Sequence, residues 1–368
     1  MRDNPSLIGK PIAIGGPSRS KGTLCTSNYE ARAFGVRAAQ PTFTACQLCP
    51  ELILIPPNFQ KYRAVADELI EIFHQFSNKV QSISLDEAYL DVTDSELFSG
   101  SASRIAQALK AEIQSKTNLT ASAGVSYNKM LAKIASDWNK PDGLFVIPPE
   151  SGEKFMTSLP LSKIPGVGKV SAERLINRGF KYCGDVTRTD IYKLIKLFGK
   201  RQALELYRAS QGISNSEVKN RSQRKSLGIE KTFFEPISTI KGIEFEMSNL
   251  RQKYSERLKR LDDFHTNKRH ISQLYVKIRF DDFSTHTREF SLSNEESQEI
   301  LAYREIPETL FLRLRHLTEN LHKENGRAIR LIGLGGKFKT AQSEQLELVA
   351  HSSCFSDENG SNEIKKPP

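Results

Sequence analysis

The chain has 368 residues, which is too long for a single hydrophobic core and predicts two to four compact units. Its hydrophobic fraction of 38% is ordinary for a water-soluble protein, and the absence of any run of about eighteen apolar residues excludes a membrane-spanning helix. The net charge of +10 favours a polyanionic partner, most commonly a nucleic acid, although a basic protein can also simply be well solvated.

The cysteines and the N-terminal residues indicate the compartment. The first residues carry no hydrophobic signal region, and the five cysteines are few and odd in number. We therefore expect a cytoplasmic protein with reduced thiols. Cys46 and Cys49 have the spacing of zinc ligands, but no second Cys or His pair follows at a useful distance. Small buried hydrophobic residues are the favoured interpretation.

The first 57 residues predict a small mixed segment. A strand begins at Pro11, a second strand lies near 23–26, and a helix over 28–34 ends at Gly35. On that helix Tyr29 and Arg32 are one turn apart, so an aromatic ring and a guanidinium share one face and could meet a nucleotide.

Residues 58–150 alternate between helices and antiparallel strands, which fits an α+β sandwich with helices on one face. The predicted elements are a helix over 62–76, a hairpin, a helix over 102–117, a strand over 119–125 and a helix over 126–138. Ser126 is expected to cap the last helix. Its buried stripe is predicted to be Leu131, Ile134, Ala135 and Trp138.

The hairpin carries a pair of adjacent acids. Apolar residues keep one parity up to Leu85 and the other parity from Ala88 onward. A single strand keeps one parity, so two strands are predicted to meet at Asp86 and Glu87. Two neighbouring carboxylates repel each other unless the turn is fully hydrated or a cation lies between them. A hydrated turn is the commoner case, and a cation site is the alternative.

The rest of the chain divides by composition. Residues 151–215 are predicted to be wholly helical, and the polar, basic stretch 216–228 is predicted to be a tether. Residues 229–340 predict a second α+β unit, and the polar tail 341–368 is expected to be disordered. In the second unit the expected strands are 273–280, 287–292 and 329–334, and the expected helices are 245–261 and 308–321.

A glycine turn lies between two predicted helices at residues 164–169. Gly166 and Gly168 permit a tight turn with outward amides, and the start of the next helix attracts anions. Lys169 adds a positive charge. This layout is typical of a helix-hairpin-helix element that holds a nucleic-acid phosphate, and a generic glycine turn is the alternative.

Further basic residues are candidates for phosphate contact. Lys277 and Arg279 lie on the polar parity of the strand 273–280, and Arg330 begins another strand. A sheet with a basic exposed face fits contact with a DNA backbone, and a merely solvated face is the alternative. Lys140 precedes a proline at the end of a helix, where it could reach a phosphate or remain an ordinary surface lysine.

Five stretches in the same order resemble the Y-family of lesion-bypass DNA polymerases, and most closely its bacterial members. The likeness covers about 1 to 350. The stretches are 28–37, 84–93, 121–125 with 131–136, 140–143 and 163–172. The resemblance implies a multidomain α+β fold with a ferredoxin-like palm, small fingers, an all-helical thumb with a helix-hairpin-helix element, and an α+β little finger.

The resemblance also implies boundaries and an activity. The implied domains are fingers 1–57, palm 58–150, thumb 151–215, linker 216–228, little finger 229–340 and tail 341–368. The implied activity is error-prone, template-directed transfer of dNTPs to the 3′ end of a primer, by a monomer without proofreading. Primer–template DNA and dNTPs are the implied partners.

The same resemblance assigns roles to residues of this sequence. Asp86 and Glu87 would hold two Mg²⁺ ions and carry catalysis. The incoming triphosphate would be held by Thr26, Tyr29, Arg32 and Lys140. The DNA backbone would be held by Gly166, Gly168, Lys169, Lys277, Arg279 and Arg330. In the tail, Gln345, Leu346 and Leu348 resemble the short peptide with which the family docks on the sliding clamp.

One feature departs from the family pattern. In this family the first palm strand carries a further essential Asp, and no acid upstream of Asp86 stands in an equivalent strand. Loss of that strand is expected to weaken two-metal catalysis and to leave neighbouring strands with unpaired backbone groups. Either the natural product starts further upstream, or the chain is a remnant that only binds DNA and the clamp. A nuclease would need another acid cluster, which the sequence lacks.

Overall fold

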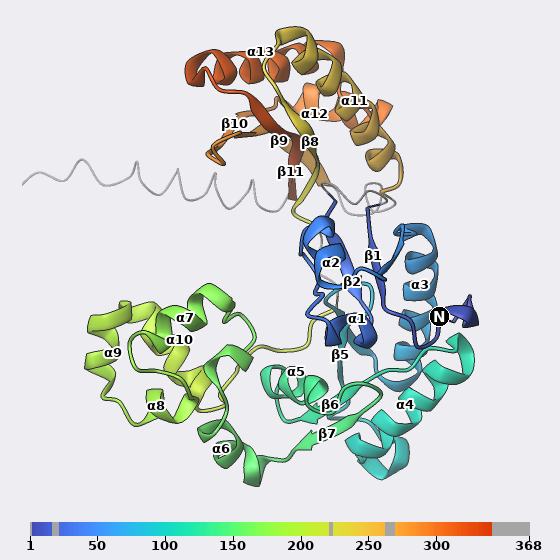
Figure 1. The fold of residues 1–368 in the computed structure, drawn as a ribbon, viewed down its shortest axis with the longest axis vertical. Coiled ribbons are helices and arrows are strands. Elements are labelled where there is room, and N and C mark those ends of the chain that lie inside the picture. Colours follow the sequence, from blue (N-terminus) through green and yellow to red (C-terminus); the bar gives the residue numbers. More distant parts are fainter. Residues whose placement is uncertain (1, 17–21, 221–223, 262–268, 341–368) are drawn as a thin grey trace, which may run out of the picture. The chain divides into compact units, whose positions relative to one another are not determined.

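The structure is a computed structural model that describes residues 2–16, 22–220, 224–261 and 269–340. The chain forms two compact units, Met1–Ser222 and Gln223–Pro368, within the predicted range of two to four (Figure 1). None of the helices in this part of the chain combines the length and the apolar character that crossing a bilayer requires.

The first unit begins with a three-stranded sheet in the order β2-β1-β3. Strand β1 pairs antiparallel with β2 and parallel with β3. Helix α2 was not predicted from the sequence; it places Ala45 and the following Cys49 in the core, which confirms Cys49 as a buried small hydrophobic residue. The elements are a short 3-10 helix at Pro5–Leu7, β1 Ile12–Gly15, β2 Leu24–Ser27, α1 Tyr29–Ala33, α2 Thr42–Leu48 and β3 Ile53–Ile55.

The middle of the first unit contains two long helices, two strand pairs and the helix α5. Strands β4 and β5 pair antiparallel, β6 and β7 pair parallel, and these four strands form two separate sheets within the described residues. Helix α5 packs on both β6 and β7. The elements are α3 Phe59–Phe76, β4 Lys79–Ser82, β5 Ala88–Asp91, a 3-10 helix at Leu97–Gly100, α4 Ala102–Thr117, β6 Ala123–Ser126, α5 Lys129–Trp138 and β7 Leu144–Ile147.

Helix α5 begins later than predicted. Its cap is Asn128, whose side-chain oxygen accepts a hydrogen bond from the Leu131 amide at 3.0 Å. Ser126 instead ends β6, where its hydroxyl donates to the Ile147 carbonyl at 2.8 Å. The prediction of Ser126 as the cap was therefore wrong, because both residue types cap helices and the sequence alone does not show which one the strand uses.

The buried stripe of α5 agrees with the sequence except at its end. Three predicted residues are buried, namely Leu131, Ile134 and Ala135. Trp138 is 46% exposed and stacks on Phe145, with a ring-centroid distance of 5.7 Å. The last turn of the helix therefore lies at the edge of the core, where a large ring is only partly covered.

The remainder of the first unit is helical, as the sequence predicts. Its buried residues include Met156, Leu159, Leu161 and Leu194, and they share one core with Leu131 of α5. This helical region is thus packed against the region that precedes it. The elements are α6 Pro149–Thr157, a 3-10 helix at Leu161–Lys163, α7 Lys169–Ile176, α8 Cys183–Thr187, α9 Ile191–Phe198 and α10 Lys200–Ser210.

The predicted tether 216–228 is shorter in the structure. The side chain of Asn220 accepts a hydrogen bond from the Val80 amide at 3.2 Å, and the Lys219 amide donates to the Gln81 side chain at 3.2 Å. The start of the segment therefore lies along β4, and its end belongs to a strand that begins at Ser226. These contacts could not be predicted from the sequence, because they use polar side chains and backbone amides, which leave no hydrophobic pattern.

Within its described residues, the second unit is a four-stranded antiparallel sheet with three helices. The strand order is β10-β9-β11-β8, and the helices share one hydrophobic core with the sheet (Figure 1). Helix α12 was not predicted, since its few apolar residues give a weak pattern; its Ser293 and Glu296 form a reciprocal cap. The elements are β8 Ser226–Ile237, α11 Ile240–Lys259, β9 Arg269–Phe280, β10 Thr285–Ser291, α12 Asn294–Tyr303, α13 Glu308–Asn325 and β11 Ile329–Thr340.

Candidate active site

The predicted hairpin is present, and the two acids lie in its turn. The register pairs Gln81 with Tyr89 and Ser82 with Ala88, so the turn spans residues 83–87. The Ile83 amide closes the turn by donating to the Glu87 carbonyl at 2.8 Å. The predicted hairpin is therefore confirmed, but Ile83 and Leu85, whose parity predicted the first strand, lie in the turn and are 48% and 43% exposed.

Each acid in the turn has one polar partner of its own. Asp86 is exposed and accepts a hydrogen bond from the Ser84 hydroxyl at 2.6 Å. Glu87 forms an ion pair with Lys133 of α5 at 2.5 Å, and the Lys133 side chain is only 25% exposed. Lys133 thus offsets part of the repulsion between the two carboxylates.

Lys133 and Lys129 were missed in the sequence. They are one turn apart on α5, on the side away from its buried stripe, and that spacing was the available signal. Lys129 donates to the side chain of Gln81 at 2.7 Å and lies 5.1 Å from the ring centroid of Tyr89. Both lysines therefore attach α5 to the hairpin.

The hairpin environment also affects Tyr89. Burial raises the pKa of its hydroxyl above the ordinary value, and the negative charge of Glu87 adds to the effect. The Tyr89 hydroxyl therefore stays protonated at neutral pH and can act only as a neutral hydrogen-bonding group.

The chemistry of the two acids fits a magnesium ion that is held partly by carboxylates and partly by a phosphate. Mg²⁺ is commonly held by one or two carboxylates, with substrate phosphates and water in the remaining positions. Asp86 and Glu87 supply two adjacent hard oxygen donors of this type. Across residues 2–16, 22–220, 224–261 and 269–340, no group of three or more His, Cys, Asp or Glu residues gathers to enclose an ion by itself.

The candidate nucleotide-binding residues fall into two places. Thr26 is exposed on β2, and Tyr29 and Arg32 lie on α1, with the Arg32 guanidinium 4.9 Å from the centroid of the Tyr29 ring. Lys140 lies in the turn after α5 and forms an ion pair with Asp137 at 2.5 Å. Within the described residues, the hydrogen bonds and ion pairs of the hairpin acids connect them to Ser84 and Lys133 but not to these four residues.

Helix α1 is set by a side chain that also holds the first strand. Asn28 caps the helix by accepting from the Ala31 amide at 3.1 Å, and it accepts from the Ile12 amide at 2.8 Å. This double contact fixes the start of α1 to β1. It leaves Tyr29, which is 48% exposed, directed away from the core.

The predicted phosphate turn is open to solvent. Gly166 has a φ of +93°, a conformation that favours glycine, and in the described part of the chain a Cβ at Gly166 or Gly168 would meet no atom within 4 Å. Lys169 is the first residue of α7, and no side chain of the described residues caps this helix. The first amides of α7 are therefore available to an anion.

The candidate DNA-binding residues of the second unit lie on the polar side of its sheet or at its end. Lys277 forms an ion pair with Glu230 at 2.8 Å, and Arg279 donates to the Thr285 hydroxyl at 3.0 Å. Arg330 lies over the ring of Phe283, with its guanidinium carbon 4.9 Å from the centroid. The basic character of this face is thus reduced by an acidic neighbour that the sequence pattern did not reveal.

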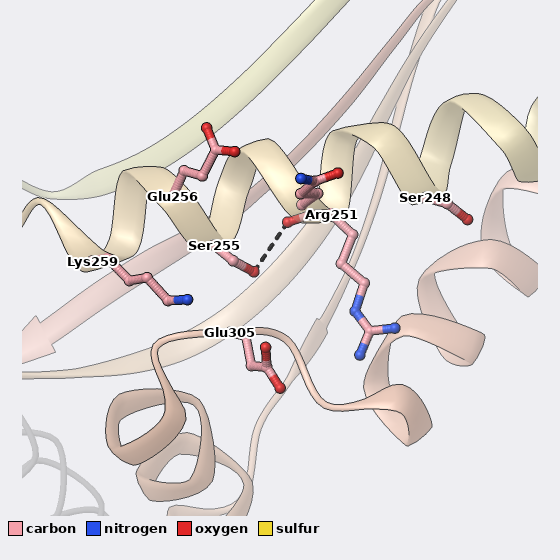
Figure 2. Close-up of a pocket in the computed structure, with 7 residues that line it drawn as sticks. Ser248, Arg251, Ser255, Glu256, Lys259 and Glu305 are labelled. Carbon is pink, nitrogen blue, oxygen red and sulfur yellow. Dashed lines mark hydrogen bonds between the residues drawn. The ribbon is translucent and has the colours of Figure 1, made fainter.

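Two hollows of the described surface are lined by residues other than the hairpin acids. One, of about 660 Å³, is formed by the α8–α9 junction and α10. The other, of about 440 Å³, lies on α11 of the second unit. Figure 2 shows that Arg251 and Lys259 extend from α11 toward the loop that carries Glu305, while the Ser255 hydroxyl donates to the Arg251 carbonyl at 3.1 Å. Neither hollow includes a predicted site residue.

The clamp-binding peptide predicted at Gln345, Leu346 and Leu348 lies outside the described residues.

Comparison with family models gives three matches along the chain. Residues 1–137 match the impB/mucB/samB family, residues 162–214 match the thumb domain of DNA polymerase-iota, and residues 224–348 match the C-terminal domain of the impB/mucB/samB family. The matches therefore extend over both compact units.

Two curated proteins that are similar to this chain agree with the family-model matches. The chain is 40% identical to DNA polymerase IV of Ectopseudomonas mendocina, over 95% of both chains. It is 42% identical to DNA polymerase IV of Mannheimia succiniciproducens, over 94% of this chain and 93% of the relative.

Among solved structures, the fold is similar to a Y-family DNA polymerase chimera of Dbh and Dpo4, with a TM-score of 0.76 and 30% identity over 91% of this chain and 94% of that one. It is also similar to an insertion ternary complex of Dbh DNA polymerase, with a TM-score of 0.63 and 28% identity over 92% and 94% of the two chains. The chain therefore belongs to the Y-family of translesion DNA polymerases and has that family's multidomain fold.

Proposed function

We propose that this chain adds dNTPs to a primer 3′ end by two-metal phosphoryl transfer, in an error-prone manner and without proofreading. The observation that carries the proposal is the turn 83–87, where Asp86 and Glu87 stand side by side and Lys133 contacts Glu87. Adjacent carboxylates in a turn repel each other unless water or a nearby cation offsets the repulsion, and the Lys133 ammonium contacts Glu87.

Two Mg²⁺ ions bound at Asp86 and Glu87 would polarise phosphate oxygens and make the primer hydroxyl a better nucleophile. The chain's own residues then act in positioning. Arg32 and Tyr29 offer a cation and a ring to the triphosphate, and Lys140 offers a second cation. Lys133 keeps Glu87 oriented from α5, because its own helix is fixed by buried residues.

The remaining assignments follow the family and are part of the same proposal. Residues 1–57 act as fingers, 58–150 as palm, 151–215 as thumb and 229–340 as little finger. Gly166, Gly168 and Lys169 hold the DNA backbone, and Lys277, Arg279 and Arg330 hold it in the second unit. Gln345, Leu346 and Leu348 dock on the sliding clamp of a cytoplasmic, monomeric enzyme.

A second function is a DNA- and clamp-binding protein without polymerase activity. The observation that favours it is the small number of carboxylates at the hairpin, since no third His, Cys, Asp or Glu joins them within the described residues. Primer extension with Mg²⁺ and dNTPs, run beside duplex binding by fluorescence anisotropy, separates the two. Extension supports the polymerase, whereas binding without any extension supports the second function.

The glycine turn of the thumb gives a further prediction. Replacing Lys169 by Gln is expected to weaken primer–template binding by about three- to tenfold, equally for DNA of different sequences. The slope of the logarithm of the binding constant against the logarithm of the salt concentration is expected to become shallower by about one. The reason is the loss of one cation at the open start of α7. Anisotropy titrations at several salt concentrations measure both quantities.

Lys154→Gln is the matched control, because Lys154 is an exposed lysine on α6 of the same region. If Lys169→Gln binds DNA with the affinity and the salt dependence of Lys154→Gln, the turn does not hold a phosphate.

A further inference from the structure

Two ion pairs cross the polar face of the sheet in the second unit. Lys277 of β9 contacts Glu230 of β8 at 2.8 Å, and Lys337 of β11 contacts Glu289 of β10 at 2.5 Å. In the strand order β10-β9-β11-β8, one strand lies between the two partners of each pair. Each ion pair therefore spans an intervening strand and lies over the surface of the sheet.

A glycine in the intervening strand makes room for one of these pairs. The register places Gly333 of β11 opposite both Lys277 and Glu230. A Cβ at Gly333 would lie 2.8 Å from the Cγ of Glu230. Glycine weakens the interior of a strand, and here the space that it leaves is filled by the Glu230 side chain.

A similar arrangement surrounds Tyr275 in the neighbouring row. A Cβ at Gly335 would lie 2.2 Å from the Tyr275 ring, so the ring rests across β11. The register places Glu289 opposite Tyr275 on the other side. The side chains of both ion pairs therefore lie over the strands between their partners.

The charges of two lysines on this face are balanced by carboxylates in the free protein. Lys277 and Lys337 are each held by a carboxylate, and Arg279 is held by the Thr285 hydroxyl. The side chains of the two lysines are 29% and 44% exposed. Ion pairs with this degree of exposure are weak and screened by solvent, so a phosphate can replace the carboxylate.

We propose that Glu230 and Glu289 are internal counter-ions that limit the affinity of this face for duplex DNA. Each lysine must leave its carboxylate before it can contact a phosphate, and the released carboxylate then faces the DNA backbone or takes up a cation from solution. This inference rests on the proposed function, in which the face binds primer–template DNA.

Glu230→Gln and Glu289→Gln test the inference in the whole chain, because Gln keeps the size of the side chain and removes its charge. Each substitution is expected to tighten binding of fluorescein-labelled primer–template DNA by about two- to fivefold, and the double substitution by about five- to twentyfold. The slope of the logarithm of the binding constant against the logarithm of the salt concentration should steepen by up to about one per substitution. The reason is that no released carboxylate takes up a cation from solution.

Glu246→Gln is the matched control. Glu246 of α11 pairs with Lys231 of β8 at 2.7 Å, so this variant also loses one Lys–Glu ion pair and one negative charge in the same unit. Neither residue belongs to the polar-face pairs. Binding of DNA by Glu246→Gln is expected to match the unsubstituted chain.

A double-mutant cycle with Lys277→Gln identifies the mechanism. If Glu230 acts by holding Lys277, the gain from Glu230→Gln disappears in the Lys277→Gln background. A gain of the same size in that background, or the same gain in Glu246→Gln, would show a general charge effect and overturn the inference.

The outcomes also separate this inference from the proposed function. A chain that binds primer–template DNA but does not respond to Glu230→Gln and Glu289→Gln overturns the inference alone. A chain that binds no primer–template DNA at about 50 mM salt overturns the proposed function and the inference together.

Discussion

Replacing Glu87 by Gln is expected to lower the rate of nucleotide incorporation on the order of 10² to 10³-fold. Gln has nearly the same shape but cannot supply an anionic oxygen to a divalent ion, and it leaves Lys133 without the carboxylate that it contacts at 2.5 Å. Single-turnover primer extension measures the rate, and anisotropy with labelled primer–template DNA shows whether binding is retained.

Asp94→Asn is the control for Glu87→Gln. Asp94 has an 88% exposed side chain and lies 3.8 Å from Lys79, at the other end of the hairpin from the turn. It makes the same change of charge near the hairpin, and we expect its rate to stay within about twofold of the unsubstituted chain. A Glu87→Gln enzyme that extends primers as fast as Asp94→Asn would remove Glu87 from the catalytic site.

Replacing Gly124 by Ala is expected to lower the free energy of unfolding of the first unit by about 3 kcal/mol or more. A Cβ on Gly124 in β6 would lie 2.1 Å from the Ala132 carbonyl oxygen and 2.2 Å from the Ser136 amide nitrogen. Both atoms are backbone atoms of α5, so the helix itself must move away from the strand. Thermal and urea unfolding measure the loss.

The same substitution should disturb the hairpin, because α5 carries Lys133 and Lys129, which contact Glu87 and Gln81.

Gly168→Ala is the matched control: its φ of −74° is accessible to alanine, and no atom of the described residues lies within 4 Å of the added carbon. We expect it to cost no more than about 1 kcal/mol. Equal stability of the Gly124→Ala and Gly168→Ala chains would show that β6 and α5 are not closely packed.

The elements with a clear periodic pattern were predictable from the sequence. The register of β4 and β5 confirms the predicted hairpin with Asp86 and Glu87 in its turn, although Ile83 and Leu85, which were predicted to end the first strand, belong to the turn. The helix predicted over 102–117 is α4 Ala102–Thr117, since Ser101 caps its start and Asn118 ends it in a left-handed conformation. Local chemistry decides such elements, so one sequence is enough.

Short elements and long-range partners were not predictable. Helix α2 is seven residues long, which is too short for a distinct helical period. Lys133 reaches Glu87 across 46 positions of sequence, and Glu230 reaches Lys277 over an intervening strand. These contacts depend on how strands and helices meet, so the sequence offered the residues as candidates without their partners.

The predicted clamp-binding tail lies outside the described residues, and the grouping of the candidate nucleotide-binding residues stays a prediction. Thr26, Tyr29 and Arg32 lie together on β2 and α1, and Lys140 lies in the turn after α5. Their grouping around a triphosphate came from the family resemblance and stays a prediction. Measuring dNTP binding by the Arg32→Ala and Lys140→Ala chains tests whether these residues hold the triphosphate.

Binding of Mn²⁺ to the whole chain tests most directly whether the hairpin acids hold divalent ions opposite a nucleotide. Electron paramagnetic resonance follows the ion in the presence of dideoxy-terminated primer–template DNA and the matching dNTP, so no chemistry is needed for the readout. We predict bound Mn²⁺ in the unsubstituted chain and its loss in the Asp86→Asn, Glu87→Gln double variant. Equal Mn²⁺ binding by the two chains would contradict the assignment of the hairpin as the metal site.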